Sequence, residues 1–176
     1  MRIVAGAWAG RDLHSPRDAR VRPTAEAVRA RWLDWLHADL QGARVLDLFA
    51  GTGALGLEAL SRGAATADFV ETRPSSLHAL RANIGVLRVK ARTRVFVKDA
   101  IHFADALSEG RYGVAFADPP YESRQLDWLV RIWQARAFAP VLAVEHARGH
   151  ALPVGGERRD MDESTAITVF RSARQP

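Results

Sequence analysis

The chain has 176 residues, which is enough for one domain with a sizeable core. Its formal net charge is +5, and such an excess of positive charge favours a polyanionic partner such as nucleic acid. The sequence has no cysteine, which excludes disulfides and thiolate metal sites, and it shows neither a signal peptide nor an apolar run of membrane length. Its six histidines have no metal-ligand spacing, so we expect a cytoplasmic protein without a membrane or metal partner.

The N-terminal part of the chain is predicted to be an extension of the main fold. Residues 1–23 hold short apolar pieces around two glycines, which predicts a small β-hairpin followed by an extended basic loop. Thr24 can cap a following helix, whose apolar residues, tryptophans included, fall on one face and predict a buried stripe. Arg29 is expected to point away from that stripe. We assign residues 1–40 to this nucleic-acid-facing extension and residues 41–176 to the main domain.

A glycine-rich stretch marks the first strand and helix of that domain. The apolar run 45–48 is typical of a buried parallel strand, and the run 55–61 has a helical pattern. Gly51 and Gly53 lie between these two runs and Gly56 lies within the second, so that the three glycines have the spacing G-x-G-x-x-G. Glycines allow a tight turn and close approach of a ligand, and the free N–H groups of a helix start point at that turn. The stretch therefore predicts a loop that binds a nucleotide-type cofactor.

Two acidic residues bear on which cofactor binds. Asp47 lies at the end of the first strand, where a carboxylate would repel a pyrophosphate but suits a cationic ammonium, as in the methionine part of S-adenosylmethionine. Glu71 ends the next apolar run, at the position of a ribose-binding carboxylate in either cofactor class. S-adenosylmethionine is therefore favoured, and an NAD-dependent oxidoreductase is the alternative that Asp47 disfavours.

The remaining chain alternates between strand-like and helix-like segments. Further strands are predicted at 67–71, 93–97, 113–117, 141–144 and 166–170. Helices are predicted to begin at Pro74, to follow Asp99, and to cover about 126–137. The segment between the last two strands is rich in glycine and charge and is expected to be a loop. This alternation predicts an α/β fold with a doubly wound, mostly parallel sheet.

Basic residues are concentrated in two parts of the sequence. Ligands of doubly wound sheets bind at the carboxyl ends of the strands, whereas the cluster 88–94 connects a helix end to a strand start. We therefore expect this cluster near the opposite edge and favour the N-terminal arginines as the nucleic-acid contacts. The predicted RNA-contacting residues are Arg17, Arg20, Arg22, Thr24 and Arg29.

A second chemical motif, Asp118-Pro119-Pro120-Tyr121, follows the fourth predicted strand. The prolines stiffen the backbone, so the Asp118 carboxylate and the Pro119 carbonyl can accept both hydrogens of one exocyclic amino group. This arrangement points the nitrogen lone pair at a methyl donor, and Tyr121 offers a face on which a base that has left its helix can stack. A rigid turn without chemistry is the alternative, and the position of the motif beside the glycine-rich loop disfavours it.

Together these motifs resemble those of the bacterial family that methylates the N2 atom of a guanine in small-subunit (16S) ribosomal RNA. The resemblance covers nearly the whole chain. It is carried by 1–4 with Gly6, Gly10 and Arg11, by 22–24 with Val28 and Arg29, by 46–63, by Val70-Glu71, by Asp99-Ala100 and by 118–121.

The resemblance implies a fold, a cofactor and a substrate. S-adenosylmethionine would be held by Asp47, Phe49, Gly51, Gly53 and Glu71, with Asp99 and Ala100 beside the adenine. Asp118, Pro119 and Tyr121 would act on a guanine of 16S ribosomal RNA, within a small ribosomal subunit or its assembly intermediate. Three alternatives stay open: an N6-adenine methyltransferase, a glutamine-N5 methyltransferase using the same motif, and an RNA-binding assembly factor.

Overall fold

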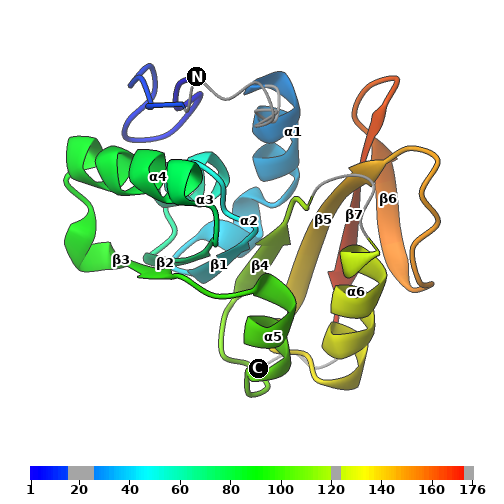
Figure 1. The fold of residues 1–176 in the computed structure, drawn as a ribbon. Coiled ribbons are helices and arrows are strands. Elements are labelled where there is room, and N and C mark those ends of the chain that lie inside the picture. Colours follow the sequence, from blue (N-terminus) through cyan, green and yellow to red (C-terminus); the bar gives the residue numbers. More distant parts are fainter. Residues whose placement is uncertain (16–25, 120–123, 173–176) are drawn as a thin grey trace.

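The computed structural model describes residues 1–15, 26–119 and 124–172, and within them seven strands form one sheet (Figure 1). The strands are β1 (Arg44–Leu48), β2 (Thr66–Val70), β3 (Thr93–Phe96), β4 (Val114–Ala117), β5 (Val141–Ala147), β6 (Gly156–Asp160) and β7 (Thr165–Arg171). The α-helices are α1 (Glu26–Trp35), α2 (His37–Leu40), α3 (Ala54–Ser61), α4 (Pro74–Leu87), α5 (Ala100–Asp105) and α6 (Gln125–Ala135). A short 3-10 helix, Lys90–Arg92, precedes β3.

The strand order in the sheet is β3-β2-β1-β4-β5-β7-β6. Strands β1 to β5 run parallel, and β7 pairs antiparallel with both β5 and β6. All four residues of β4 are buried, as expected for a central parallel strand covered on both faces. The predicted doubly wound, mostly parallel α/β fold is therefore confirmed.

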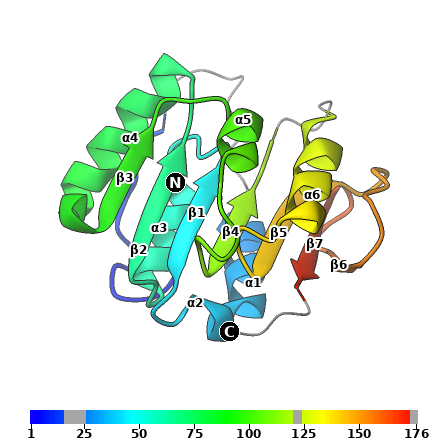
Figure 2. The ribbon, with the colours of Figure 1, turned by 90° about the horizontal axis from the view of Figure 1, so that it is seen from below.

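Helices cover both faces of this sheet (Figure 2). Helices α1, α3 and α4 share one buried apolar cluster with the sheet, and α5 and α6 share the other. Trp32 of α1 is fully buried and meets Phe116 of β4 edge to face, with ring centroids 5.6 Å apart. The prediction that the tryptophans of α1 belong to the core is confirmed for Trp32, whereas Trp35 is only half-buried. Each fully buried side chain of this kind contributes about 1.5–3 kcal/mol to stability.

The pairing register brings the carboxyl ends of the parallel strands to one edge. Leu48 at the end of β1 pairs with both Val70 of β2 and Ala117 of β4. Val70 in turn pairs with Phe96, the last residue of β3. Residues that directly follow these strands therefore lie along one edge, which is where doubly wound sheets bind their ligands.

The predicted N-terminal hairpin is present and packs against α3 (Figure 1). Its two arms are joined by bonds such as that from the Ile3 N–H to the Arg11 carbonyl, at 2.9 Å. Gly6 has a φ of +86°, and a Cβ atom there would lie 2.0 Å from the carbonyl oxygen of Ser61 at the end of α3. Because Ile3 and Leu13 are buried in the same cluster as the sheet, the hairpin belongs to the main core.

One sequence expectation about the fold is wrong. The segment between β5 and β7 was expected to be a loop, but Gly156–Asp160 forms strand β6 and pairs with β7. Its residues Glu157, Arg158, Arg159 and Asp160 are exposed, so the sequence lacks the alternation of apolar and polar residues that indicates a strand. Such charges are common on edge strands because they discourage pairing with other chains.

The structure leaves part of the predicted N-terminal extension untested, and it bears on membrane association. The basic loop and the Thr24 cap lie outside the described residues, and the division of the chain at residue 40 stays a prediction. In the part of the chain that the structure describes, no helix is both long and apolar enough to span a bilayer.

Candidate active site

The predicted cofactor loop joins the end of β1 to the start of α3. Phe49, Gly51 and Gly53 all adopt positive φ angles, of +62°, +55° and +79°. The turn is closed by a 2.7 Å hydrogen bond from the Gly53 N–H to the Ala50 carbonyl, and a Cβ on Gly53 would come within 2.3 Å of Leu80. A positive φ at Phe49 is unfavourable for a residue with a side chain and persists only where the surroundings enforce it. The loop is thus a tight turn, enforced by its surroundings, that holds the N-terminus of α3 at the carboxyl edge of the sheet.

Asp47 lies beneath this loop and is almost fully buried. Its Oδ2 atom accepts a 2.9 Å hydrogen bond from the Gly56 N–H in the first turn of α3. Burial raises the pKa of Asp47 well above its ordinary value of 3.8, and the nearby carboxylates of Asp118 and Glu71 raise it further, while the Gly56 bond lowers it. An ionised carboxylate can accept about four hydrogen bonds. Asp47 therefore suits a cationic donor that would offset its burial.

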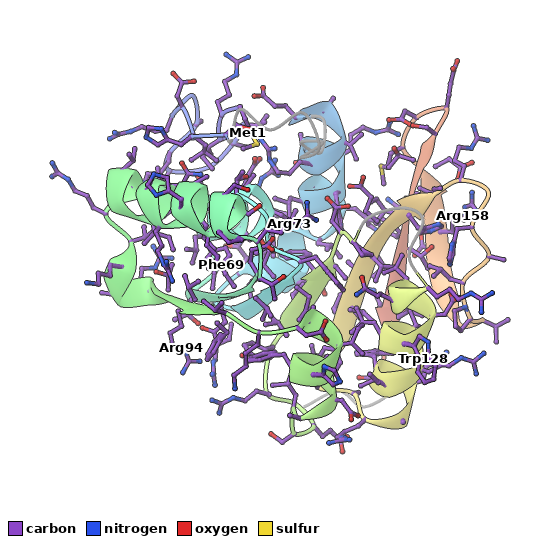
Figure 3. The ribbon with its side chains drawn as sticks, viewed as in Figure 1. Met1, Phe69, Arg73, Arg94, Trp128 and Arg158 are labelled. Atoms are coloured by element: carbon purple, nitrogen blue, oxygen red, sulfur yellow. The ribbon has the colours of Figure 1, made fainter. Side chains whose placement is uncertain are left out.

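Glu71 links the end of β2 to the same loop. Its Oε2 atom accepts from the Gly51 N–H at 2.8 Å. Its Oε1 atom accepts from the N–H groups of Thr72 and Arg73, at 2.7 and 2.8 Å. These bonds fix the direction of the carboxylate. Phe69 and Arg73, which precede and follow Glu71 by two residues in the sequence, are labelled in Figure 3. Oε2 keeps a second lone pair, which leaves the capacity to accept from a ribose hydroxyl.

Four acidic residues come together on one face at the carboxyl edge. Asp47 is the last residue but one of β1, Glu71 and Asp118 directly follow β2 and β4, and Glu145 lies in β5 directly after its last residue paired with β4. Successive side chains of a strand point to opposite faces. The sequence neighbours that alternate with the four acids all belong to the cluster under α5 and α6: Leu46, Leu48, Val70, Ala117 and Val144. The four carboxylates therefore share the face covered by α1, α3 and α4.

Glu145 is the member of this group that the sequence prediction missed. It is 5% exposed, and its neighbour Val144 pairs with Ala117, the residue before Asp118. The sequence carried a usable signal, because Glu145 ends the fifth apolar run just as Glu71 and Asp118 follow theirs.

The residues predicted to lie beside the adenine are found at the start of α5. Asp99 is the N-cap of this helix, and its Oδ1 atom accepts from the Ile101 and His102 N–H groups at 3.0 and 2.9 Å. Its side chain is 46% exposed, whereas Ala100 is buried. Asp99 thus has a structural role that the sequence prediction did not name, and its contact with an adenine stays a prediction.

The predicted catalytic motif begins directly after β4. Asp118 is half-buried and Pro119 is buried, at the same edge as the cofactor loop. The structure thus brings Asp118 together with Asp47 and Glu71, as expected from the strand order. Pro120 and Tyr121 lie outside the described residues, and the stacking role of Tyr121 stays a prediction.

The prediction that Arg29 contacts RNA is wrong. Its side chain is fully buried, and Nε donates to Glu58 Oε2 at 2.7 Å. Glu58 lies on α3 and is itself fully buried, and its other oxygen accepts from Arg62 at 2.9 Å. A buried carboxylate requires cationic partners, and Arg29 is one of them. The acid within the otherwise apolar run of α3 was the sequence signal for this pair.

The other predicted RNA contacts, Arg17, Arg20, Arg22 and Thr24, lie outside the described residues. The basic cluster 88–94 lies where it was expected. Arg92 donates from Nε to the Ala65 carbonyl at 2.9 Å, next to the first residue of β2 and hence at the amino edge. Arg94 pairs with the buried Asp68.

Comparisons with known proteins fit this geometry. The family model described as "Conserved hypothetical protein 95" matches residues 1–165. The chain belongs to this family. Among curated relatives, the Escherichia coli K12 protein named ribosomal RNA small subunit methyltransferase D is 36% identical over 132 residues, which cover 75% of this chain and 66% of that protein. The Bacillus subtilis protein YlbH, whose name gives rRNA methylation as an inferred activity, is 32% identical over 97% of this chain and 98% of its own length.

A solved structure gives the same result. The Escherichia coli protein yhhF, described as an inferred methyltransferase, superposes with a TM-score of 0.84 at 30% identity and covers 99% of both chains. The resemblance inferred from the motifs is confirmed at the level of the family, and the chain has the fold and family of a methyltransferase. This family and fold imply S-adenosylmethionine as the methyl donor. Across the described ranges, no group of three or more acidic and histidine side chains has the arrangement of a metal site.

Proposed function

We propose that this protein transfers a methyl group from S-adenosylmethionine to the exocyclic N2 amino group of a guanine in 16S ribosomal RNA. The observation that carries the proposal is the group of carboxylates at the carboxyl edge: Asp47 and Glu71 bind the glycine-rich loop and the start of α3, and Asp118 begins the motif Asp118-Pro119. The names of the Escherichia coli and Bacillus subtilis relatives support ribosomal RNA as the substrate class. The small-subunit context comes from the name of the former.

The residues at this edge fit S-adenosylmethionine. The ligand carries positive charge on its sulfur and its ammonium group, and Asp47 offers that ammonium a buried carboxylate whose pKa burial has raised. Glu71 and the backbone around Phe49, Gly51 and Gly53 would hold the ribose, and Asp99 and Ala100 the adenine. The pyrophosphate of NAD would instead face the negative charge of the same carboxylates, which disfavours the oxidoreductase alternative.

The reaction follows from the position of Asp118. When bound, S-adenosylmethionine supplies a methyl group on a positively charged sulfur. The Asp118 carboxylate and the Pro119 carbonyl would accept the two amino hydrogens, so that the nitrogen lone pair faces the methyl donor. As the C–N bond forms and the S–C bond breaks, positive charge would pass from the sulfur to that nitrogen, where the fixed carboxylate would stabilise it, and the surplus amino proton would leave to water after the transfer.

RNA binding would place the guanine at this motif. A base inside a helix cannot reach the carboxyl edge, so it must leave its stack, and Tyr121 would stack on it. Arg17, Arg20, Arg22 and Thr24, which precede α1 in the sequence, would contact the RNA backbone. The substrate would be a small ribosomal subunit or its assembly intermediate, which places the activity in the cytoplasm.

Methyl transfer with a radiolabelled cofactor tests the proposal. Small subunits from a strain that lacks the modification are incubated with the protein and tritiated S-adenosylmethionine, and the RNA is digested to nucleosides. We expect the label in N2-methylguanosine. Label in N6-methyladenosine or in protein glutamine would favour the alternatives that use the same motif. Cofactor binding without any transfer would favour an RNA-binding assembly factor.

A further inference from the structure

Asn83 of α4 is fully buried, and no role at the proposed site has yet been given to it. Its Nδ2 atom donates to the carbonyl of Thr52 at 3.0 Å and to the carbonyl of His14 at 3.1 Å. Its Oδ1 atom accepts from the N–H of His14 at 2.7 Å. One side chain thus joins two backbone segments, at His14 and at Thr52, that are 38 residues apart in the sequence.

The pattern of these bonds requires an amide. The surroundings present two carbonyl acceptors and one N–H donor, and an amide supplies two donors and one acceptor from one side chain. A carboxylate could not donate to either carbonyl, and an apolar side chain could bond to none of the three backbone groups, of which the Thr52 carbonyl bond is buried. The two donors and one acceptor of the Asn83 amide therefore fit the backbone groups of both segments at the same time.

The two segments lead to the two proposed binding sites. Thr52 lies between Gly51 and Gly53, in the loop proposed to hold S-adenosylmethionine. His14 lies two residues before the basic segment 16–25, to which the RNA-contacting arginines belong. A second contact joins the same parts, because the Thr52 hydroxyl lies 4.0 Å from the Met1 sulfur. Figure 1 shows the N-terminal segment lying over α3 and α4.

We propose that Asn83 is a positioning residue that couples the cofactor loop to the N-terminal segment 1–15, so that cofactor bound at the loop also steadies this segment and thereby favours RNA binding. This inference rests on the proposed function. Two ligands that order one connected unit favour each other's binding, because the second ligand loses less conformational entropy. The coupling is reciprocal, and such factors are typically about 5- to 150-fold.

The first test measures this coupling factor. RNA affinity is determined by titration with and without saturating S-adenosylhomocysteine, for the wild type, Asn83→Ala and the control Leu87→Ala. Leu87 lies one turn further along α4 and is buried in the core, so its truncation also destabilises the fold. We expect the factor to fall to about 1 in Asn83→Ala and to stay at its wild-type value in Leu87→Ala. A wild-type factor of 1, an unchanged factor in Asn83→Ala, or equal losses in both variants would overturn the inference.

The second test does not need RNA and so separates the coupling from the proposed substrate. Hydrogen exchange of the amides in residues 1–15 is followed with and without S-adenosylhomocysteine. In the wild type and Leu87→Ala, we expect the ligand to slow exchange of the His14 amide, and in Asn83→Ala to leave it unchanged. Absence of this protection in the wild type, with ligand bound, would overturn the coupling. Failure of any RNA to bind, with protection intact, would instead contradict only the proposed function.

Discussion

At the scale of single residues, the loss of folding stability that the site causes is concentrated at Asp47. Its carboxylate is buried, and two further carboxylates raise its pKa in addition to the effect of burial. In the unfolded chain the same group has an ordinary pKa near 3.8. The folded protein therefore binds this proton more tightly than the unfolded chain does. Stability from this group is fully present below pH 3.8 and is lost as the pH rises through the folded pKa.

Asp47→Asn should therefore stabilise the free protein at neutral pH and weaken cofactor binding. The variant keeps an oxygen for the Gly56 N–H but has no charge to bury and none to offer the ammonium. Thermal melting between about pH 4 and pH 8 should show the stability advantage of the variant growing with pH. Calorimetry should show weaker S-adenosylmethionine binding. A variant with the pH profile and the cofactor affinity of the wild type would contradict this role.

Most of these site residues could be predicted from the sequence because each is an acidic residue at the end of an apolar, strand-like run. Asp47, Glu71 and Asp118 could be recognised in this way, and Glu145 carried the same signal. Arg29 could not be placed correctly from its own helix alone. Its burial depends on Glu58, which lies 29 residues away on α3.

At the scale of elements, the ion pair between Arg29 and Glu58 fastens α1 to α3. The Arg29 guanidinium also donates to the Arg2 carbonyl, and Glu58 accepts from the Val4 N–H at 3.3 Å. The pair therefore fixes the N-terminal hairpin against both helices. Its role is structural, since neither side chain reaches solvent.

Arg29→Ala should destabilise the protein by about 3–5 kcal/mol, because it leaves a buried carboxylate with one cationic partner fewer. Urea unfolding measures this loss. The dependence of RNA affinity on salt should keep its wild-type slope, since Arg29 is buried away from any phosphate. A shallower salt slope with unchanged stability would restore Arg29 as an RNA contact.

Elements with a buried face could be predicted from the sequence, and the charged edge strand could not. The apolar runs of β1, β2, β4 and β5 predict strands by themselves. Strand β6 has four charged residues in sequence, and its pairing with β7 depends on a neighbour that only the folded sheet supplies. The same limit applies to the docking of the hairpin on Ser61, which rests on a close backbone approach at Gly6.

At the scale of the whole molecule, the positive charge and the acidic edge have separate roles. The carboxylates gather at one edge for a small cationic ligand, whereas the net charge of +5 favours a polyanion. Arg92, in the basic cluster 88–94, lies at the amino edge, which leaves the N-terminal arginines as the proposed RNA contacts.

Replacing Arg17, Arg20 and Arg22 together should flatten the salt dependence of RNA affinity. Each lost phosphate contact lowers the log–log slope by about 0.7–0.9. Binding of S-adenosylhomocysteine should stay near its wild-type value, which serves as the control for folding. If the slope is unchanged, and substitution of Arg88 and Arg92 lowers it instead, the RNA lies on the amino edge.

The central claim is that Asp118 accepts from the amino group that receives the methyl group. Single-turnover methylation of small subunits at saturating cofactor, with wild type, Asp118→Asn and Asp118→Ala, tests it most directly. Loss of the fixed acceptor in Asp118→Ala should raise the barrier by about 2.7–4 kcal/mol, or roughly 100- to 1000-fold in rate. Asp118→Asn keeps a carbonyl oxygen and should lose distinctly less, while both variants bind cofactor as the wild type does. Equal losses in the two variants would contradict the account, because a general base, which Asn cannot replace, would then be required.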